Sequence, residues 1–99
     1  MGATNFLNQV KAKTAQEAFE SARKRALEAY GNSGYSGSVA EKSTFLEVKA
    51  PAAVKKDPVL LERFLDELLD DPRFDDKWGP AAVVQTARNN YAIVGWASE

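Results

Sequence analysis

The chain of 99 residues contains no cysteine and no histidine. Without thiols it can form neither a disulfide nor a thiolate zinc site, and without imidazole it has no Cys–His or Ser–His catalytic pair. Long apolar runs are also missing: the longest covers residues 91–97, whereas a membrane-spanning helix needs about 20 residues. We therefore expect neither a cofactor nor a bound metal ion, and no insertion into a membrane.

The N-terminal residues lack the charged region and apolar stretch that together mark a secretory signal, so we expect a cytoplasmic protein. Hydrophobic residues make up 44% of the chain and charged residues 27%, which is ordinary for a folded domain. Residues 1–99 are predicted to form a single domain, because this length supports one hydrophobic core and is too short for two domains.

Residues 14–30 are predicted to form an amphipathic helix. Thr14 and Glu17 have the spacing of a capping box, in which a hydroxyl and a carboxylate satisfy the first backbone N–H groups. Apolar side chains then recur every three or four residues; they are Ala15, Ala18, Phe19, Ala22, Ala26 and Tyr30. A second helix is predicted to begin after Asp57, with Pro58 at its first position, and to end before Pro72.

Alternating or continuous apolar runs predict four strands, at residues 5–13, 45–49, 81–87 and 91–97. The last two are expected to form a hairpin, and the strand 91–97, which is apolar on both faces, is expected to lie centrally in the sheet. The order β-α-β-α-β-β predicts an α+β two-layer sandwich, with a mostly antiparallel sheet and both helices on one face.

Charge is divided unevenly along the chain, although the formal net charge is only −1. Residues 1–56 carry nine basic and five acidic side chains, and residues 57–99 carry four basic and nine acidic ones. Acidic side chains crowd one segment of the second part; they are Asp66, Glu67, Asp70, Asp71, Asp75 and Asp76. Acids near a helix C-terminus oppose the helix dipole, so helix stability does not explain them.

Three interpretations of this acidic segment stay open: a solvated surface, a docking surface for a basic protein, and a divalent cation site. The calcium-loop pattern needs oxygen ligands at alternate positions and a central glycine, which residues 70–76 do not supply. Burial in the core and exposure as a binding anchor are alternatives for Trp78 and Trp96. The candidate partner-binding residues are Asp66, Asp70, Asp71, Asp75, Asp76 and Trp78.

Residues 31–44 form the longest predicted loop, with glycine at positions 31, 34 and 37. Glycine-rich backbone can direct several N–H groups at an anion, but the loop matches neither the Walker A nor the dinucleotide-binding pattern. A long turn and a protein contact are the alternatives to a nucleotide or other small anion. The candidate ligand-binding residues are Arg23, Gly34, Tyr35, Ser36, Gly37, Ser38, Glu41 and Lys42.

Basic side chains gather on the first predicted strand and helix, where they are a solvated face or a phosphate-binding patch; they are Lys11, Lys13, Arg23, Lys24 and Arg25. No aromatic-rich RNA-binding strand accompanies them, so nucleic acid is not the expected partner. Tyr35, Glu41 and Lys42 are acid–base candidates, but no second carboxylate is spaced to pair with Glu41. We therefore predict no enzymatic activity and no catalytic residues.

The loop 34–42 (GYSGSVAEK), the tail segments 77–81 (KWGPA) and 95–97 (GWA), and the opening 1–3 (MGA) occur together in this chain. They resemble a group of small uncharacterised proteins encoded by bacteriophages, prophages and related mobile elements. Members of that group often carry histidine just before the loop, where this chain has Asn32 and Ser33. The resemblance implies a phage context, in which small non-enzymatic proteins often bind host proteins, including defence systems.

Together these observations predict a monomer or small homo-oligomer in the cytoplasm of a bacterial host. Its expected partner is a host protein, bound through the acidic segment, and inhibition of a host defence system is the expected outcome. The alternative is a small-molecule or nucleotide-binding protein that uses the glycine-rich loop 31–44.

Overall fold

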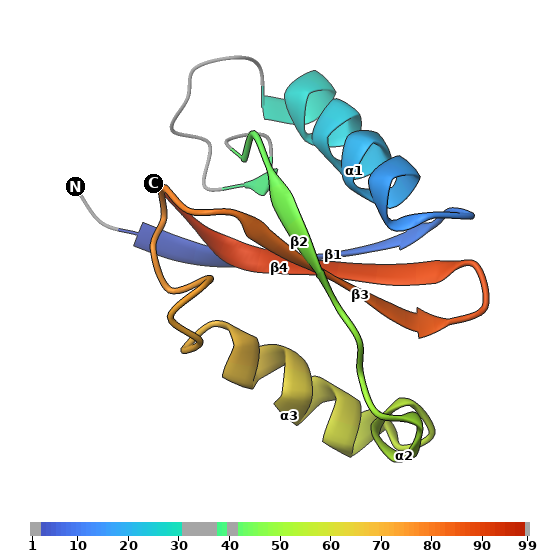
Figure 1. Cartoon of the computed structure of the whole chain (residues 1–99). Coiled ribbons are helices and arrows are strands. Elements are labelled where there is room, and N and C mark those ends of the chain that lie inside the picture. Colours follow the sequence, from blue (N-terminus) through green and yellow to red (C-terminus); the bar gives the residue numbers. More distant parts are fainter. Residues whose placement is uncertain (1–2, 31–37, 40–41, 99) are drawn as a thin grey trace.

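The computed structural model describes residues 3–30, 38–39 and 42–98 (Figure 1). The strands are β1 (Ala3–Lys11), β2 (Phe45–Val48), β3 (Ala81–Ala87) and β4 (Asn90–Ser98), and the helices are α1 (Ala15–Tyr30), α2 (Ala52–Lys55) and α3 (Pro58–Leu68). The predicted α+β class and order β-α-β-α-β-β are confirmed. The sequence did not predict α2, which adds one helical turn before α3.

The four strands form an open sheet in the order β1-β4-β3-β2. β4 pairs antiparallel with both of its neighbours and β2 pairs parallel with β3, so the mostly antiparallel sheet is confirmed. The interior position of β4 is the one that its apolar sequence predicts. In the β3–β4 turn, Asn89 has φ 58°, a left-handed conformation that asparagine tolerates better than most residues.

The two long helices lie on opposite faces of the sheet, so the predicted two-layer arrangement with both helices on one face is wrong. α1 packs on the face that carries Val83 and Ile93, and α3 packs on the face that carries Val84 and Val94 (Figure 1). Successive side chains of a strand point to opposite faces, and residues 81–84 and 91–94 are buried throughout. Strands that are apolar on both faces need cover on both sides, which produces three layers.

Local capping explains where both long helices begin. The Thr14 hydroxyl accepts a hydrogen bond from the Glu17 N–H at 3.1 Å, which confirms the predicted cap. The Glu17 carboxylate reaches back one residue farther than in a standard capping box and accepts from the Lys13 N–H at 3.2 Å. Asp57 caps α3 by accepting from the Val59 N–H at 2.9 Å. Within the described residues, no helix is long and apolar enough to cross a bilayer.

Gly95 brings the edge strand β1 and the interior strand β4 into close contact. It lies opposite Phe6 in the β1–β4 register, and the Phe6 ring occupies the space above it. A Cβ atom at position 95 would lie 2.9 Å from Phe6 Cζ, closer than carbon atoms pack. Phe6 is itself part of the core beneath α1, so its ring has little room to move.

Gly95→Ala is therefore expected to destabilise the domain by about 1–3 kcal/mol, the range for overpacking in a core. Chemical denaturation followed by tryptophan fluorescence measures this change. Combining Gly95→Ala with Phe6→Leu should cost less than the sum of the two single changes, because the smaller side chain makes room for the new methyl group. Strict additivity of the two free-energy changes would show that the Phe6–Gly95 contact is not the cause.

Candidate binding surfaces

The side chain of Lys42 is buried at one end of the sheet, with only 2% of the residue's surface exposed. Its ammonium donates hydrogen bonds to the carbonyl oxygens of Gly79 at 2.8 Å and Lys77 at 3.0 Å, and a longer one to Asp76 at 3.4 Å. An ammonium has three N–H donors, which matches these three acceptors. We call this arrangement the Lys42 anchor, because it ties the loop between α3 and β3 to the chain just before β2.

The Lys42 anchor also brings together residues from three distant parts of the sequence. Lys42 ends the stretch 34–42, Lys77 and Gly79 belong to the stretch 77–81, and Gly95 begins the stretch 95–97. The Cε atom of Lys42 passes 3.4 Å from the position that a Cβ atom on Gly95 would occupy. The spacing of these stretches therefore reflects a packing requirement, since a buried ammonium needs both its carbonyl partners and room for its stem.

This geometry is at odds with Lys42 as a phosphate ligand. Its side chain points into the protein and its donors match three backbone carbonyls, so it does not present its charge to an anion outside. Ser38 is buried as well. The candidate residues Gly34, Tyr35, Ser36, Gly37 and Glu41 lie outside the described residues.

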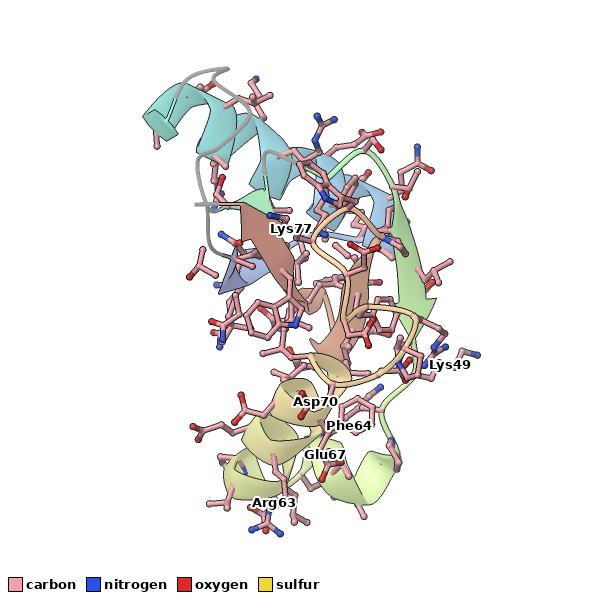
Figure 2. The ribbon with its side chains drawn as sticks, turned by 90° about the vertical axis from the view of Figure 1, so that its left-hand side faces the viewer. Lys49, Arg63, Phe64, Glu67, Asp70 and Lys77 are labelled. Atoms are coloured by element: carbon pink, nitrogen blue, oxygen red, sulfur yellow. The ribbon has the colours of Figure 1, made fainter. Side chains whose placement is uncertain are left out.

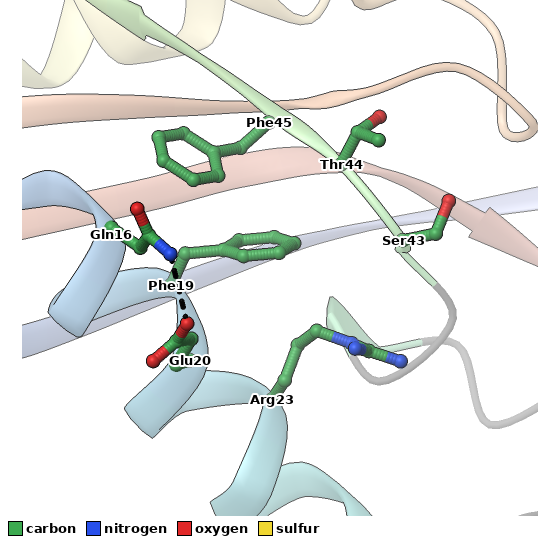
Figure 3. Close-up of a pocket in the computed structure, with 7 residues that line it drawn as sticks. All are labelled: Gln16, Phe19, Glu20, Arg23, Ser43, Thr44 and Phe45. Atoms are coloured by element: carbon green, nitrogen blue, oxygen red, sulfur yellow. Dashed lines mark hydrogen bonds between the residues drawn. The ribbon is translucent and has the colours of Figure 1, made fainter.

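Arg23, the remaining ligand candidate, lines a hollow of about 370 Å³ between α1 and β2 (Figure 3). Its floor is formed by the rings of Phe19 and Phe45, whose centroids lie 4.8 Å apart. Ser43 and Thr44 line one side, and in Figure 3 their hydroxyl groups point away from Arg23. On the helix side, Gln16 donates a hydrogen bond to Glu20 at 3.1 Å. The sequence patterns did not single out this hollow, because its two aromatic residues come from distant segments.

The acidic candidates surround the end of α3 and the loop that follows it. Figure 2 shows Glu67 following Arg63 along α3, with Asp70 just past the end of the helix and Lys77 farther from it. Asp75 and Asp76 line one open hollow of about 480 Å³ together with Lys77 and Trp96, whereas Asp66 lines a separate hollow beside β1. The structure thus brings Asp75 and Asp76 together and places Asp66 apart from them.

Asp71 differs from the other acids because a neighbouring guanidinium neutralises it. Arg73 donates to both carboxylate oxygens of Asp71, at 3.1 Å and 3.0 Å, and its backbone N–H donates a further bond at 2.9 Å. The side-chain hydrogen bonds from Arg73 hold the pKa of Asp71 below its ordinary value. The hydrogen bonds between Asp71 and Arg73 close a local turn in the loop. Because Asp71 is paired in this way, it has less negative charge available for a binding partner.

The loop between α3 and β3 is held at several points although it has no regular secondary structure. The Phe74 side chain is fully buried in the core beneath α3. The Trp96 indole N–H donates to the Leu69 carbonyl at 2.8 Å, at the C-terminal end of α3. The Asp76 carboxylate accepts from the Trp78 N–H at 2.9 Å. Together with the Lys42 anchor, these contacts give the loop one defined shape.

The two tryptophans have different roles in this region. Trp96 is partly buried and hydrogen-bonded, so it serves the packing of α3 against β4. Trp78 is 68% exposed, and the Lys77 ammonium lies 5.3 Å from the centroid of its ring. An exposed indole on a fixed loop is the arrangement expected of a binding anchor.

Within residues 3–30, 38–39 and 42–98, acidic side chains do not gather in a group that would hold a metal ion. No protein-family model, curated protein or solved structure matches the chain.

Replacing Lys42 by methionine tests whether the Lys42 anchor holds the loop. Lys42→Met removes the ammonium but keeps most of the stem, so buried carbonyl oxygens lose their donors; we expect a loss of about 2–4 kcal/mol of stability. Amide hydrogen exchange should accelerate most between residues 74 and 80. Lys49→Met, at an exposed position, is the matched control and should change stability by less than about 0.5 kcal/mol. Equal effects of the two substitutions would contradict the anchor.

Proposed function

We propose that this protein is a non-enzymatic binding domain that recognises a basic protein. Its contact region, which we call the acidic surface, consists of Asp70, Asp71, Asp75, Asp76 and Trp78; the predicted Asp66 is left out because it lines a separate hollow. The observation that carries the proposal is the 68% exposure of Trp78 on a loop that the Lys42 anchor and the buried Phe74 hold from beneath. A large aromatic side chain left in water on a fixed loop gains most when a partner covers it.

The fixed shape of the loop favours binding for an entropic reason. A flexible loop loses conformational freedom when a partner orders it, and that loss subtracts from the affinity. Here the loop is already ordered by hydrogen bonds to backbone atoms at residues 69, 76, 77 and 79. Tryptophan is also among the residues that contribute most to binding energy when they are buried at the centre of an interface.

The charges around Trp78 favour a basic partner. Asp75 and Asp76 line the open hollow together with Lys77 and Trp96, so two carboxylates face one ammonium there. A lysine or arginine side chain from a partner fits such a site, since its aliphatic stem packs on an aromatic ring while its charge lies near carboxylates. Asp70, which is exposed on the preceding turn, adds to the attraction at longer range.

The resemblance to phage-encoded proteins supports a narrower form of this proposal. The partner is then a host protein in the bacterial cytoplasm, and occupying its basic surface inhibits a defence system. A basic surface that normally binds nucleic acid is the target that carboxylates imitate best, because they replace phosphates.

Affinity capture with surface variants tests the proposal. Wild-type protein, Trp78→Ala and the double variant Asp70→Lys/Asp75→Lys are immobilised and exposed to bacterial lysate, and the retained proteins are quantified by mass spectrometry. Asp71 and Asp76 are left intact because their carboxylates hold the loop. A true partner should be retained by the wild type and bound at least about tenfold more weakly by both variants in a titration with the purified partner.

The matched control reverses two acids away from the acidic surface, Glu28 and Glu47, which are both exposed. Glu28→Lys/Glu47→Lys changes the net charge by the same amount, so it separates local recognition from overall charge. Binding to the true partner should survive this change and weaken as salt is added. The proposal fails if every retained protein binds the control and the acidic-surface variants equally.

The hollow lined by Arg23 favours a second candidate function, the binding of a nucleotide or other small anion. A guanidinium above an aromatic floor suits a phosphate attached to a flat ring. Millimolar ATP, AMP or inorganic phosphate should then raise the melting temperature by a few degrees. Arg23→Gln should abolish the rise, whereas Lys24→Gln on the same helix should preserve it. A melting temperature that none of the three ligands changes would eliminate this candidate.

A further inference from the structure

We propose that β1 is a homodimer interface, through which two copies of the chain join their sheets edge to edge. β1 is a nine-residue strand at the edge of the sheet, and within the described chain its only sheet neighbour is β4. It contains no proline and a single charged residue, Lys11. Proteins usually protect an exposed edge with charge, proline or a short strand, so a long uncharged edge is suited to pairing.

The other edge of the sheet, at β2, has the protection that β1 lacks. β2 is only four residues long, contains Glu47 and is followed directly by Lys49. Its parallel pairing with β3 involves the same four residues. The contrast between a short charged edge and a long uncharged one identifies β1 as the edge that is open to a partner strand.

Hydrogen bonding shows which backbone groups of β1 point outward. The Ala12 N–H donates to the Asn89 carbonyl at 3.0 Å, at the end of the β1–β4 register. Along an antiparallel strand, the N–H and C=O groups of successive residues point to opposite sides of the strand. Because Ala12 bonds toward β4, the even-numbered residues of β1 also direct these groups to β4. The odd-numbered residues therefore direct their N–H and C=O groups toward the open edge; they are Ala3, Asn5, Leu7, Gln9 and Lys11.

These outward residues are self-complementary when a second copy pairs antiparallel with a two-fold axis at Leu7. This register aligns all nine residues of β1 with those of the second copy. Leu7 then faces Leu7 of the other copy, Asn5 faces Gln9, and Lys11 faces Ala3, so two amide pairs flank a central apolar pair and like charges are not opposed. A two-fold axis makes each of these contacts occur twice except the central one.

Leu7 gives the pairing its apolar component. Its side chain is 54% exposed although it sits at the middle of a strand. Beside it lies a hollow of about 200 Å³ that is lined by the apolar residues Leu65, Leu69 and Val94 and also by Glu62 and Asp66. A second Leu7 at this position covers the exposed side chain and extends the apolar surface between β1 and α3.

Sedimentation and native mass spectrometry over a micromolar concentration range test the proposal. The wild type should be a dimer at twice the 10.8 kDa chain mass. Leu7→Lys should place two like charges at the axis, and Gln9→Pro should remove an outward N–H without affecting the bonds to β4; each should weaken dimerisation at least tenfold. Leu46→Lys, at a 44% exposed position on the opposite edge, is the control and should remain dimeric.

Cysteine cross-linking tests the register directly, because the chain contains no cysteine. Directly opposed residues in a hydrogen-bonded antiparallel pair have Cα atoms about 5.5 Å apart, within reach of a short bifunctional thiol reagent. Leu7→Cys should therefore form a covalent dimer with such a reagent, whereas Leu46→Cys should not. A monomeric wild type, a dimer that survives both β1 substitutions, or dissociation caused by Leu46→Lys would overturn the proposal.

Discussion

One buried ammonium determines how this domain closes. Lys42 reaches under the loop that precedes β3 and donates to the carbonyl oxygens of residues 76, 77 and 79. A buried charge is costly unless it is fully hydrogen-bonded, so the loop must adopt the shape that presents these carbonyls together. Gly95 leaves room for the lysine stem, and Trp78 projects into solvent from the loop that results. The candidate binding surface is thus a consequence of a packing constraint inside the protein.

The second constraint is the apolar character of β3 and β4 on both faces. Residues 81–84 and 91–94 are buried on alternate sides, so the sheet needs a helix above and a helix below. The alanine stripe of α1 allows close approach to one face, while leucines and phenylalanines of α3 and its loop fill the other. With both faces covered, the described surface that stays open to partners lies at the sheet edges and at the end that carries the acidic loop.

The two long helices, α1 and α3, were predictable from the sequence because their signals are local. Thr14 with Glu17, and Asp57 with Pro58, mark their beginnings within a few residues. The face of the sheet that α3 covers depends on how the chain crosses from β2 to β3, and hydrophobic periodicity does not encode that crossover. The continuous apolar runs of β3 and β4 were the signal in the sequence that both faces need cover. Lys42 is separated by 35 residues from its Lys77 partner, so spacing suggested an anion site where the structure has an internal contact. The hollow at Arg23 likewise joins two distant segments.

The charges around α3 have an arrangement that its backbone dipole reinforces. Lys55 and Lys56 precede the Asp57 cap at its N-terminus, and Asp70 follows its C-terminus, where Asp71 is paired with Arg73. A helix carries about half a positive charge at its N-terminus and half a negative charge at its C-terminus, so side chains and backbone contribute electric moments in the same direction. The result is a fixed moment along the helix axis, obtained at some cost to helix stability. The field of a positively charged partner exerts a torque on this moment, which turns the acidic end toward the partner before contact.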